Sequence, residues 1–142
     1  ARYFAEIEFD FEGIPPIVSD ANRLSQVLLN LLMNARDAIE EKWGPKDTKA
    51  GEKKIILKTS CDGRNVICEV CDTGKGIPEN ISDKIFEPFF TTKEVGKGTG
   101  LGLSISYGIV NDCGGSIHVV PNKPEGACFV LQFPLQETND GK

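Results

Sequence analysis

A long amphipathic segment near the start of the chain most constrains the fold. Between residues 20 and 41, apolar side chains recur at helical spacing, at Leu24, Val27, Leu28, Leu31, Leu32, Ala35, Ala38 and Ile39. This spacing predicts a helix that ends near Glu41, with Asp20 or Ser19 as its N-cap. Because such a helix is stable only when its apolar stripe is buried, the rest of the chain must supply a surface for it to pack on.

β-rich runs supply that surface. Five runs predict strands, at residues 5–11, 54–60, 65–71, 116–120 and 128–135. The second and third runs flank Asp62-Gly63, a dipeptide that favours a hairpin turn. A second helix is expected from Leu101 to Gly114, and a short one over residues 82–85. The order strand, helix, hairpin, loop, helix, hairpin predicts an α/β (α+β) two-layer sandwich, in which one mixed β-sheet is covered on one face by helices.

The overall composition excludes several classes of protein. The chain has 142 residues and a net charge of −5, which favours one domain over residues 1–135 with a polar tail at 136–142. An acidic chain without a long Lys/Arg run is unsuited to gripping nucleic-acid phosphates. No apolar stretch approaches the roughly 18 residues of a spanning helix, so no direct membrane contact is expected. Because the chain begins at Ala1 and Met33 is its only methionine, we expect it to be part of a longer protein.

The cysteine and histidine content limits the possible chemistry. The five cysteines are odd in number and too sparse for a disulfide scaffold, which predicts reduced thiols of the cytosolic kind. Cys68 and Cys71 lie three residues apart in an expected strand, so they would point to opposite faces and would not bind a metal together. His118 is the only histidine, so the chain cannot form a Ser-His-Asp or Cys-His nucleophilic site.

Two asparagines interrupt the apolar pattern of the first helix. Asn30 and Asn34 are four residues apart and therefore share a face, with Gln26 and Asp37 near the same stripe. Asparagine is a mediocre residue inside a helix, because its side chain competes for backbone hydrogen bonds. Either this polar face simply meets water, or an amide oxygen ligates a hard cation such as Mg²⁺, which prefers oxygen ligands.

A D-x-G-x-G segment follows the third expected strand. Asp72 at the end of that strand could accept a hydrogen bond from an exocyclic amine such as that of adenine, and Gly74 and Gly76 allow a backbone to approach a ligand closely. The alternative is a tight turn in which the aspartate caps its own backbone.

A glycine-rich segment at residues 96–103 leads into the second helix. Backbone N–H groups at a helix N-terminus attract phosphate, and the alternative is a mobile loop with no ligand. Three phenylalanines just before it, at residues 86–90, are expected to pack on something. They could anchor a lid from which Lys93 and Lys97 reach phosphates, or they could form an ordinary apolar loop cluster.

Taken together and in this order, these segments resemble the catalytic and ATP-binding domain of bacterial sensor histidine kinases. LLNLLMNARDA resembles the N box of that family, DTGKGI its G1 box, IFEPFFTTK its F box and GKGTGLGLSI its G2 box, and PEGACFVLQFPL resembles its last glycine-containing strand. The match spans about residues 14–135, and the F-box and G2 segments resemble those of nitrogen-regulation and PAS-linked sensors. The resemblance implies the fold shared with gyrase-type, mismatch-repair and heat-shock-chaperone ATPases.

The same resemblance implies the cofactors, ATP and Mg²⁺, and the roles of individual residues. Asn34 would ligate Mg²⁺, Asn30 would support the phosphate side, Lys93 would act with them in catalysis, and Asp72 would accept from the adenine amine. The other nucleotide-binding positions that it implies are Asp37, Gly74, Gly76, Ile77, Phe89, Thr92, Lys97, Gly98, Thr99, Gly100, Leu101, Gly102 and Leu103.

The implied activity is transfer of the ATP γ-phosphate to a histidine on a separate dimerisation domain of the same protein. A response-regulator receiver domain would be the second partner, and the location would be cytoplasmic even if the parent protein is membrane-anchored. The family's phosphoacceptor histidine has no match here, and Cys113 stands where the family often has histidine. Two alternatives stay open: a serine kinase of the same fold, and a degenerate nucleotide-binding module that does not turn over ATP.

Overall fold

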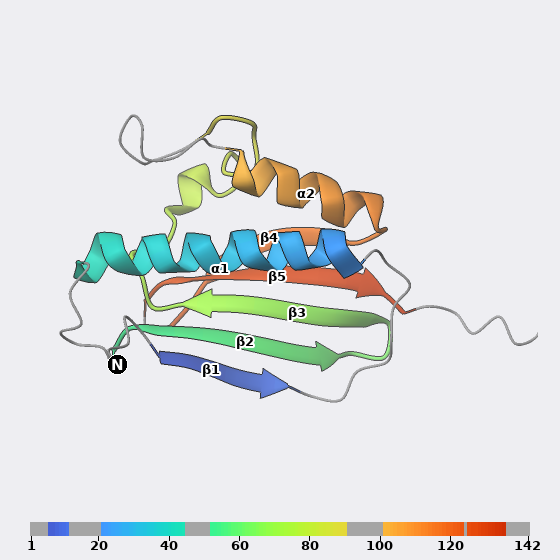
Figure 1. Cartoon of the computed structure of the whole chain (residues 1–142), viewed down its shortest axis with the longest axis horizontal. Helices are drawn as coiled ribbons and strands as arrows, with labels where there is room; N and C mark the ends of the chain where they lie inside the picture. Colours follow the sequence, from blue (N-terminus) through green and yellow to red (C-terminus); the bar gives the residue numbers. More distant parts are fainter. Residues whose placement is uncertain (1–5, 12–20, 45–51, 91–100, 124, 136–142) are drawn as a thin grey trace, which may run out of the picture.

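The computed structural model describes residues 6–11, 21–44, 52–90, 101–123 and 125–135. The order of its elements is the expected one (Figure 1): β1 (Glu6–Phe11), α1 (Ala21–Trp43), β2 (Lys54–Cys61), β3 (Asn65–Asp72), the 3₁₀ helix η1 (Glu79–Ile81), α2 (Gly102–Asp112), β4 (Ser116–Pro121) and β5 (Ala127–Pro134). The predicted polar tail at 136–142 and the proposed N-caps of α1 lie outside the described residues.

The strands form one five-stranded sheet in the order β1-β2-β3-β5-β4. β1 runs parallel to β2, whereas the other neighbouring pairs are antiparallel, so the predicted mixed sheet is confirmed. The β2–β3 hairpin turns at Asp62-Gly63 as expected. Gly63 has a φ of 90°, and the Asp62 carboxylate accepts the N–H groups of Arg64 at 2.9 Å and Asn65 at 2.7 Å.

Both helices cover the same face of the sheet, which confirms the two-layer sandwich. Alternate side chains of β3, β4 and β5 join those of α1 and α2 in one core. The fully or nearly fully buried members of this core include Val27, Leu31, Ala35, Ile39, Val70, Val110, Ile117, Phe129, Leu131 and Phe133. The described helices include none long and apolar enough to cross a membrane.

The predicted short helix over residues 82–85 is wrong. The structure has a 3₁₀ helix at Glu79–Ile81, followed by turns. The backbone N–H and the hydroxyl of Ser82 both donate to the Glu79 carbonyl oxygen, at 3.2 and 2.9 Å. Because this i to i−3 pattern satisfies the backbone within one tight turn, no α-helix propagates from it.

The prediction that all cysteines are reduced thiols is also wrong, because Cys71 and Cys128 form a disulfide. The register of β3 and β5 makes the two residues direct cross-strand partners, with Cα atoms 4.0 Å apart. They are separated by 57 positions in the chain, so only the strand order brings them together. Cys68 lies in a strand as expected and points to the opposite face from Cys71, into the core.

Candidate functional site

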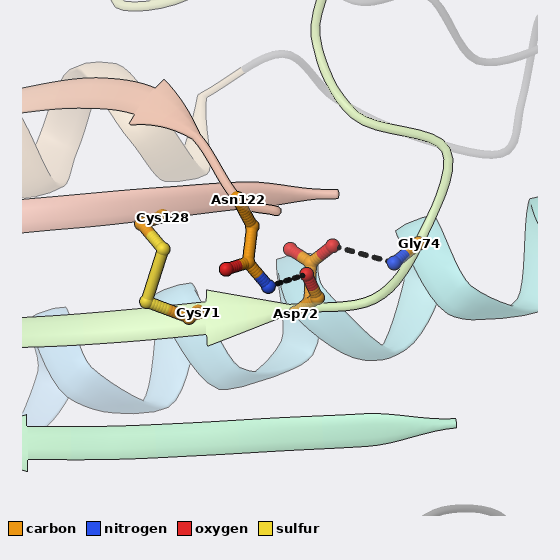
Figure 2. Close-up of a disulfide and its surroundings, with 5 residues drawn as sticks. All are labelled: Cys71, Asp72, Gly74, Asn122 and Cys128. Carbon is orange, nitrogen blue, oxygen red and sulfur yellow. Dashed lines mark hydrogen bonds between the residues drawn. A yellow bond between two sulfur atoms is a disulfide. The ribbon is translucent and has the colours of Figure 1, made fainter. Parts of the chain in front are cut away.

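Asp72, the last residue of β3, is a buried carboxylate at the end of the sheet. Asp72 is 1% exposed, and its Oδ1 accepts a hydrogen bond from the Gly74 N–H at 2.8 Å (Figure 2). Burial raises the pKa of Asp72 to about 6, against the opposing effect of hydrogen bonds from the N–H groups of Gly74 and Ala127. The bond to Gly74 confirms the capped turn that the sequence offered as an alternative. A capped turn does not need burial, whereas this carboxylate is buried with two N–H donors, so its oxygens retain the capacity to accept a further hydrogen bond.

Three backbone segments meet around Asp72 with no room for a side chain. A Cβ on Gly74 would lie 2.6 Å from the backbone carbon of Ala38 in α1, and a Cβ on Gly126 would lie 1.9 Å from the Asp72 carbonyl oxygen. Gly76 has a φ of +77° and faces Gly126. The glycines of the D-x-G-x-G segment were expected to admit a ligand. In the structure they let the end of β3, α1 and the β4–β5 turn approach one another.

Residues that sequence reasoning missed fix this turn in place. The Asn122 side-chain amide donates to the Asp72 carbonyl oxygen at 2.8 Å (Figure 2). The Trp43 indole N–H donates to the Thr73 carbonyl oxygen at 3.2 Å, and the Thr73 hydroxyl donates to the Glu52 carbonyl oxygen at 2.8 Å. The one available signal was Trp43, a lone tryptophan at the edge of a polar segment.

The asparagine face of α1 is turned toward the start of α2. The Asn30 Nδ2 donates to the hydroxyl of fully buried Ser106 at 3.2 Å and to the Gly102 carbonyl oxygen at 3.4 Å. For Asn30, the alternative of a polar face that simply meets water is therefore wrong. One turn later, Asn34 is half-buried, and its side chain forms no hydrogen bond with any described residue. Asp37, a further turn on, is ion-paired with Arg36 at 3.3 Å.

Asn34 is therefore the residue of this face that fits a hard cation. Asn34 is half-buried and its side chain makes no hydrogen bond to another described group, which suits a single protein ligand to Mg²⁺. Asn30 instead fixes the beginning of α2 against α1. Leu101, at the N-cap position of α2, makes no side-chain cap hydrogen bond to a described residue, and the N-terminus of such a helix is a place where a phosphate oxygen can bind.

The aromatic segment before α2 is only partly as expected. Phe86 and Phe90 pack against the core, and the Phe86 ring meets Phe129 edge-on with centroids 6.2 Å apart. Phe89 is 72% exposed, so the expectation that all three rings pack on something is wrong. Its φ of 66° is unusual for a bulky residue, and the left-handed turn leaves the ring outside the core.

The remaining predicted site residues divide into two groups. Ile77 and Leu103 are half-buried and pack against the hydrophobic core. The predicted lid residues lie outside the described part of the chain, and their roles stay predictions: Thr92, Lys93, Lys97, Gly98, Thr99 and Gly100.

The raised pKa of Asp72 gives stability a testable pH dependence. Between 3.8, its ordinary value, and about 6, the folded chain holds a proton that the unfolded chain has released. Its contribution to the free energy of unfolding is therefore fully present below about pH 4 and is lost as the pH rises through about 6, a change of roughly 3 kcal/mol. In urea denaturation, the stability of wild type relative to Asp72→Asn should fall by this order over that range. A constant difference would mean that the carboxylate titrates normally.

Comparison with known proteins gives a consistent family match. The family model described as "Histidine kinase-, DNA gyrase B-, and HSP90-like ATPase" matches residues 19–137. The sensor kinase CckA of Brucella abortus is 44% identical over 126 residues, which are 84% of this chain and 13% of CckA. Sensor histidine kinase ZraS of Escherichia coli K12 is 39% identical over 94% of this chain and 27% of its own length. The chain thus spans only a minor part of these relatives.

Solved structures agree with this match. The catalytic domain of histidine kinase ThkA superposes with a TM-score of 0.69 at 37% identity, covering 90% of this chain and 80% of that domain. Full-length ShkA in complex with AMPPNP superposes with a TM-score of 0.74 at 32% identity, over 92% of this chain and 25% of ShkA.

Proposed function

Since the chain belongs to the family of histidine kinase-, DNA gyrase B- and HSP90-like ATPases, we propose that it transfers the γ-phosphate of ATP to a histidine, as the catalytic domain of a two-component sensor kinase. The observation that carries the proposal is the buried Asp72 carboxylate at the end of β3, with one oxygen held by the Gly74 N–H. A carboxylate in this position can accept a hydrogen bond from a neutral donor such as the adenine amine and does not need a cation as its partner. Its pKa of about 6 keeps it ionised at neutral pH.

The other described residues account for the phosphate side. Asn34 would hold Mg²⁺, which would supply charge neutralisation at the phosphates. Asn30 positions the start of α2, whose first N–H groups would bind phosphate oxygens. Lys93 and Lys97 would neutralise the remaining phosphate charge. Catalysis is then mainly positioning and charge stabilisation of the phosphoryl group in transit.

The phosphoacceptor would come from another part of the parent protein. The bond from the γ-phosphorus to the bridging oxygen breaks as a bond to an imidazole nitrogen forms, and ADP leaves. His118 is an exposed residue of β4, so we do not assign it as the acceptor. We infer that the dimerisation domain of the same protein supplies the histidine, that a response-regulator receiver domain takes the phosphate next, and that this domain works in the cytoplasm.

Replacing Asn34 by Ala tests the catalytic proposal. When the dimerisation domain is supplied, we expect phosphotransfer from radiolabelled ATP to fall on the order of 100-fold or more, because the only described candidate ligand for the metal is removed. Met33→Ala, an exposed change on the same helix, is the matched control and should leave the rate unchanged. Undiminished transfer by Asn34→Ala would rule out the Mg²⁺ assignment.

The stability of the label identifies the acceptor. Phosphohistidine is lost in acid, so an acid-labile label supports the proposed function. An acid-stable label would indicate the serine kinase alternative. Nucleotide binding without transfer to any acceptor would indicate a degenerate binding module.

A further inference from the structure

The Cys71–Cys128 disulfide lies directly beside the proposed nucleotide site. Cys71 immediately precedes Asp72 in β3, and Cys128 is the second residue of β5, just after the turn that contacts Asp72 (Figure 2). Both residues are buried, at 0% and 6% exposure. The disulfide and the site therefore lie together, where β3 ends and β5 begins.

We propose that Cys71 and Cys128 are a reversible dithiol–disulfide modification site whose oxidation state sets the nucleotide affinity of the Asp72 site. The inference rests on the proposed function, because it assigns a means of regulation to that same site. The disulfide form is the tighter-binding form, since it is the one in which Asp72 has the geometry described above.

The coupling follows from how closely β5 and its preceding turn hold Asp72. The Asn122 amide donates to the Asp72 carbonyl oxygen at 2.8 Å, and the Asn122 N–H donates to the Gly126 carbonyl oxygen at 3.0 Å. Gly126 packs so closely that even a methyl group in its place would overlap the Asp72 carbonyl. The Ala127 N–H, next to Cys128, also bonds the carboxylate. A change in the spacing of β3 and β5 at this end must therefore move Asp72 or its partners.

Breaking the disulfide requires such a change. Bonded sulfur atoms are about 2 Å apart, whereas heavy atoms in non-bonded contact need roughly 3.5 to 4 Å. In a buried, close-packed position, the added separation is taken up by turning the cysteine side chains against their neighbours or by widening the strand pair. Both loosen the preorganised site, and preorganisation contributes directly to affinity.

The pair suits a reversible site better than a permanent cross-link. The two strands are already joined along a ladder from Asn65 to Cys71, and the core on the other face holds the sheet to both helices. In a reducing compartment, where we place this domain, disulfides that form are mostly transient or redox-sensing. The Glu69 carboxylate lies within 4.8 Å of both sulfurs, but bonded sulfurs cannot ligate a metal, because the ligand form is the thiolate.

The other cysteine of β3 does not compete for this role. The cross-strand partners of Cys68 are Thr59 in β2 and Leu131 in β5, so no cysteine stands opposite it with which it could form a disulfide. Its side chain also points into the core on the opposite face of the strand.

The oxidation is a thiol–disulfide exchange with a small disulfide such as oxidised glutathione. One cysteine thiolate attacks a sulfur of the small disulfide and releases one small thiol, and the second cysteine then displaces the other. The two protein thiols lose two electrons and two protons in total, and the small disulfide is reduced to two thiols. Because Cys71 is fully buried, exchange requires local opening of this end of the sheet and is slower than at an exposed thiol.

Affinity for ADP in the two oxidation states tests the proposal. The 142-residue chain is reduced with dithiothreitol or oxidised with glutathione disulfide, the Cys71–Cys128 link is verified by peptide mass mapping, and Kd for ADP is measured by calorimetry. We expect Kd to be about fivefold higher in the reduced form and to recover on reoxidation. Cys128→Ala should bind ADP like the reduced form under both conditions. Cys68→Ala, the matched control on the same strand, should keep the full response.

Linkage provides a second measurement on the unmodified chain. A fivefold preference of ADP for the oxidised form must make the disulfide harder to reduce by the same factor, which is a shift of about 20 mV for this two-electron couple. Equal affinity in both oxidation states with no such shift would overturn the proposal while leaving the proposed function standing, as would mapping of the disulfide to other cysteines. No ADP binding in either state would instead overturn the proposed function and the inference with it.

Discussion

Asp72→Asn should remove most of the thermal stabilisation that Mg²⁺-ADP gives the wild-type chain. At about 100 times its Kd, a ligand adds roughly 2.7 kcal/mol, which corresponds to a rise in Tm of roughly 8 to 12 °C for a domain of this size. Asn retains one oxygen for the Gly74 N–H but replaces the other with an amide that donates. Two donors, this amide and the adenine amine, would then face each other in a site that is 1% exposed. Such an unpaired buried group lowers affinity by roughly 100-fold or more.

The hairpin aspartate provides the matched control for this experiment. The Asp62 carboxylate also accepts backbone N–H groups, which lower its pKa, but it lies in an exposed turn at the opposite end of β3. Asp62→Asn makes the same chemical change away from the site and should retain the full rise in Tm with nucleotide. A full rise in Asp72→Asn would place the adenine elsewhere.

The fold was largely predictable because its signals are local. The helical spacing from Leu24 to Ile39 is interpretable within one element, and the same holds for the D-G turn between β2 and β3. The element order then leaves few ways to bury the apolar stripe of α1. The short segment over 82–85 was mispredicted because, over a few residues, hydrogen bonds of the backbone and of Ser82 outweigh periodicity.

The candidate site was predictable only as a set of residue types. The sequence placed Asn30 and Asn34 on one face, but not the bond from Asn30 to Ser106, which lies 76 positions away. Likewise, the cross-strand pairing of Cys71 with Cys128 depends on β5 being inserted between β3 and β4 in the sheet. Contacts of this kind depend on strand order and register, which no local pattern specifies. An error of one residue in the register would turn each side chain to the other face of the sheet.

Gly126→Ala should have the second large effect, because Gly126 makes the closest of these non-local contacts. The new methyl carbon would lie 1.9 Å from the Asp72 carbonyl oxygen, a backbone atom that already accepts from Asn122 and cannot move freely. Gly126 also has a φ of +110°, which side-chain-bearing residues rarely adopt. Overpacking and backbone strain together predict a loss of roughly 2 to 4 kcal/mol in the free energy of unfolding, measured by urea denaturation.

Gly114→Ala separates these two causes. Gly114 has a comparable φ of +81°, but nothing lies within 4 Å of the position of its Cβ. It should therefore show only the backbone strain, roughly 1 kcal/mol, and should bind ADP like wild type. Because the displaced carbonyl belongs to Asp72, the residue that we propose binds the adenine amine, Gly126→Ala should also weaken ADP binding in the fraction that folds. Equal losses of stability in the two variants, with ADP binding intact in both, would mean that the turn can retreat from Asp72 and that the site does not depend on this contact.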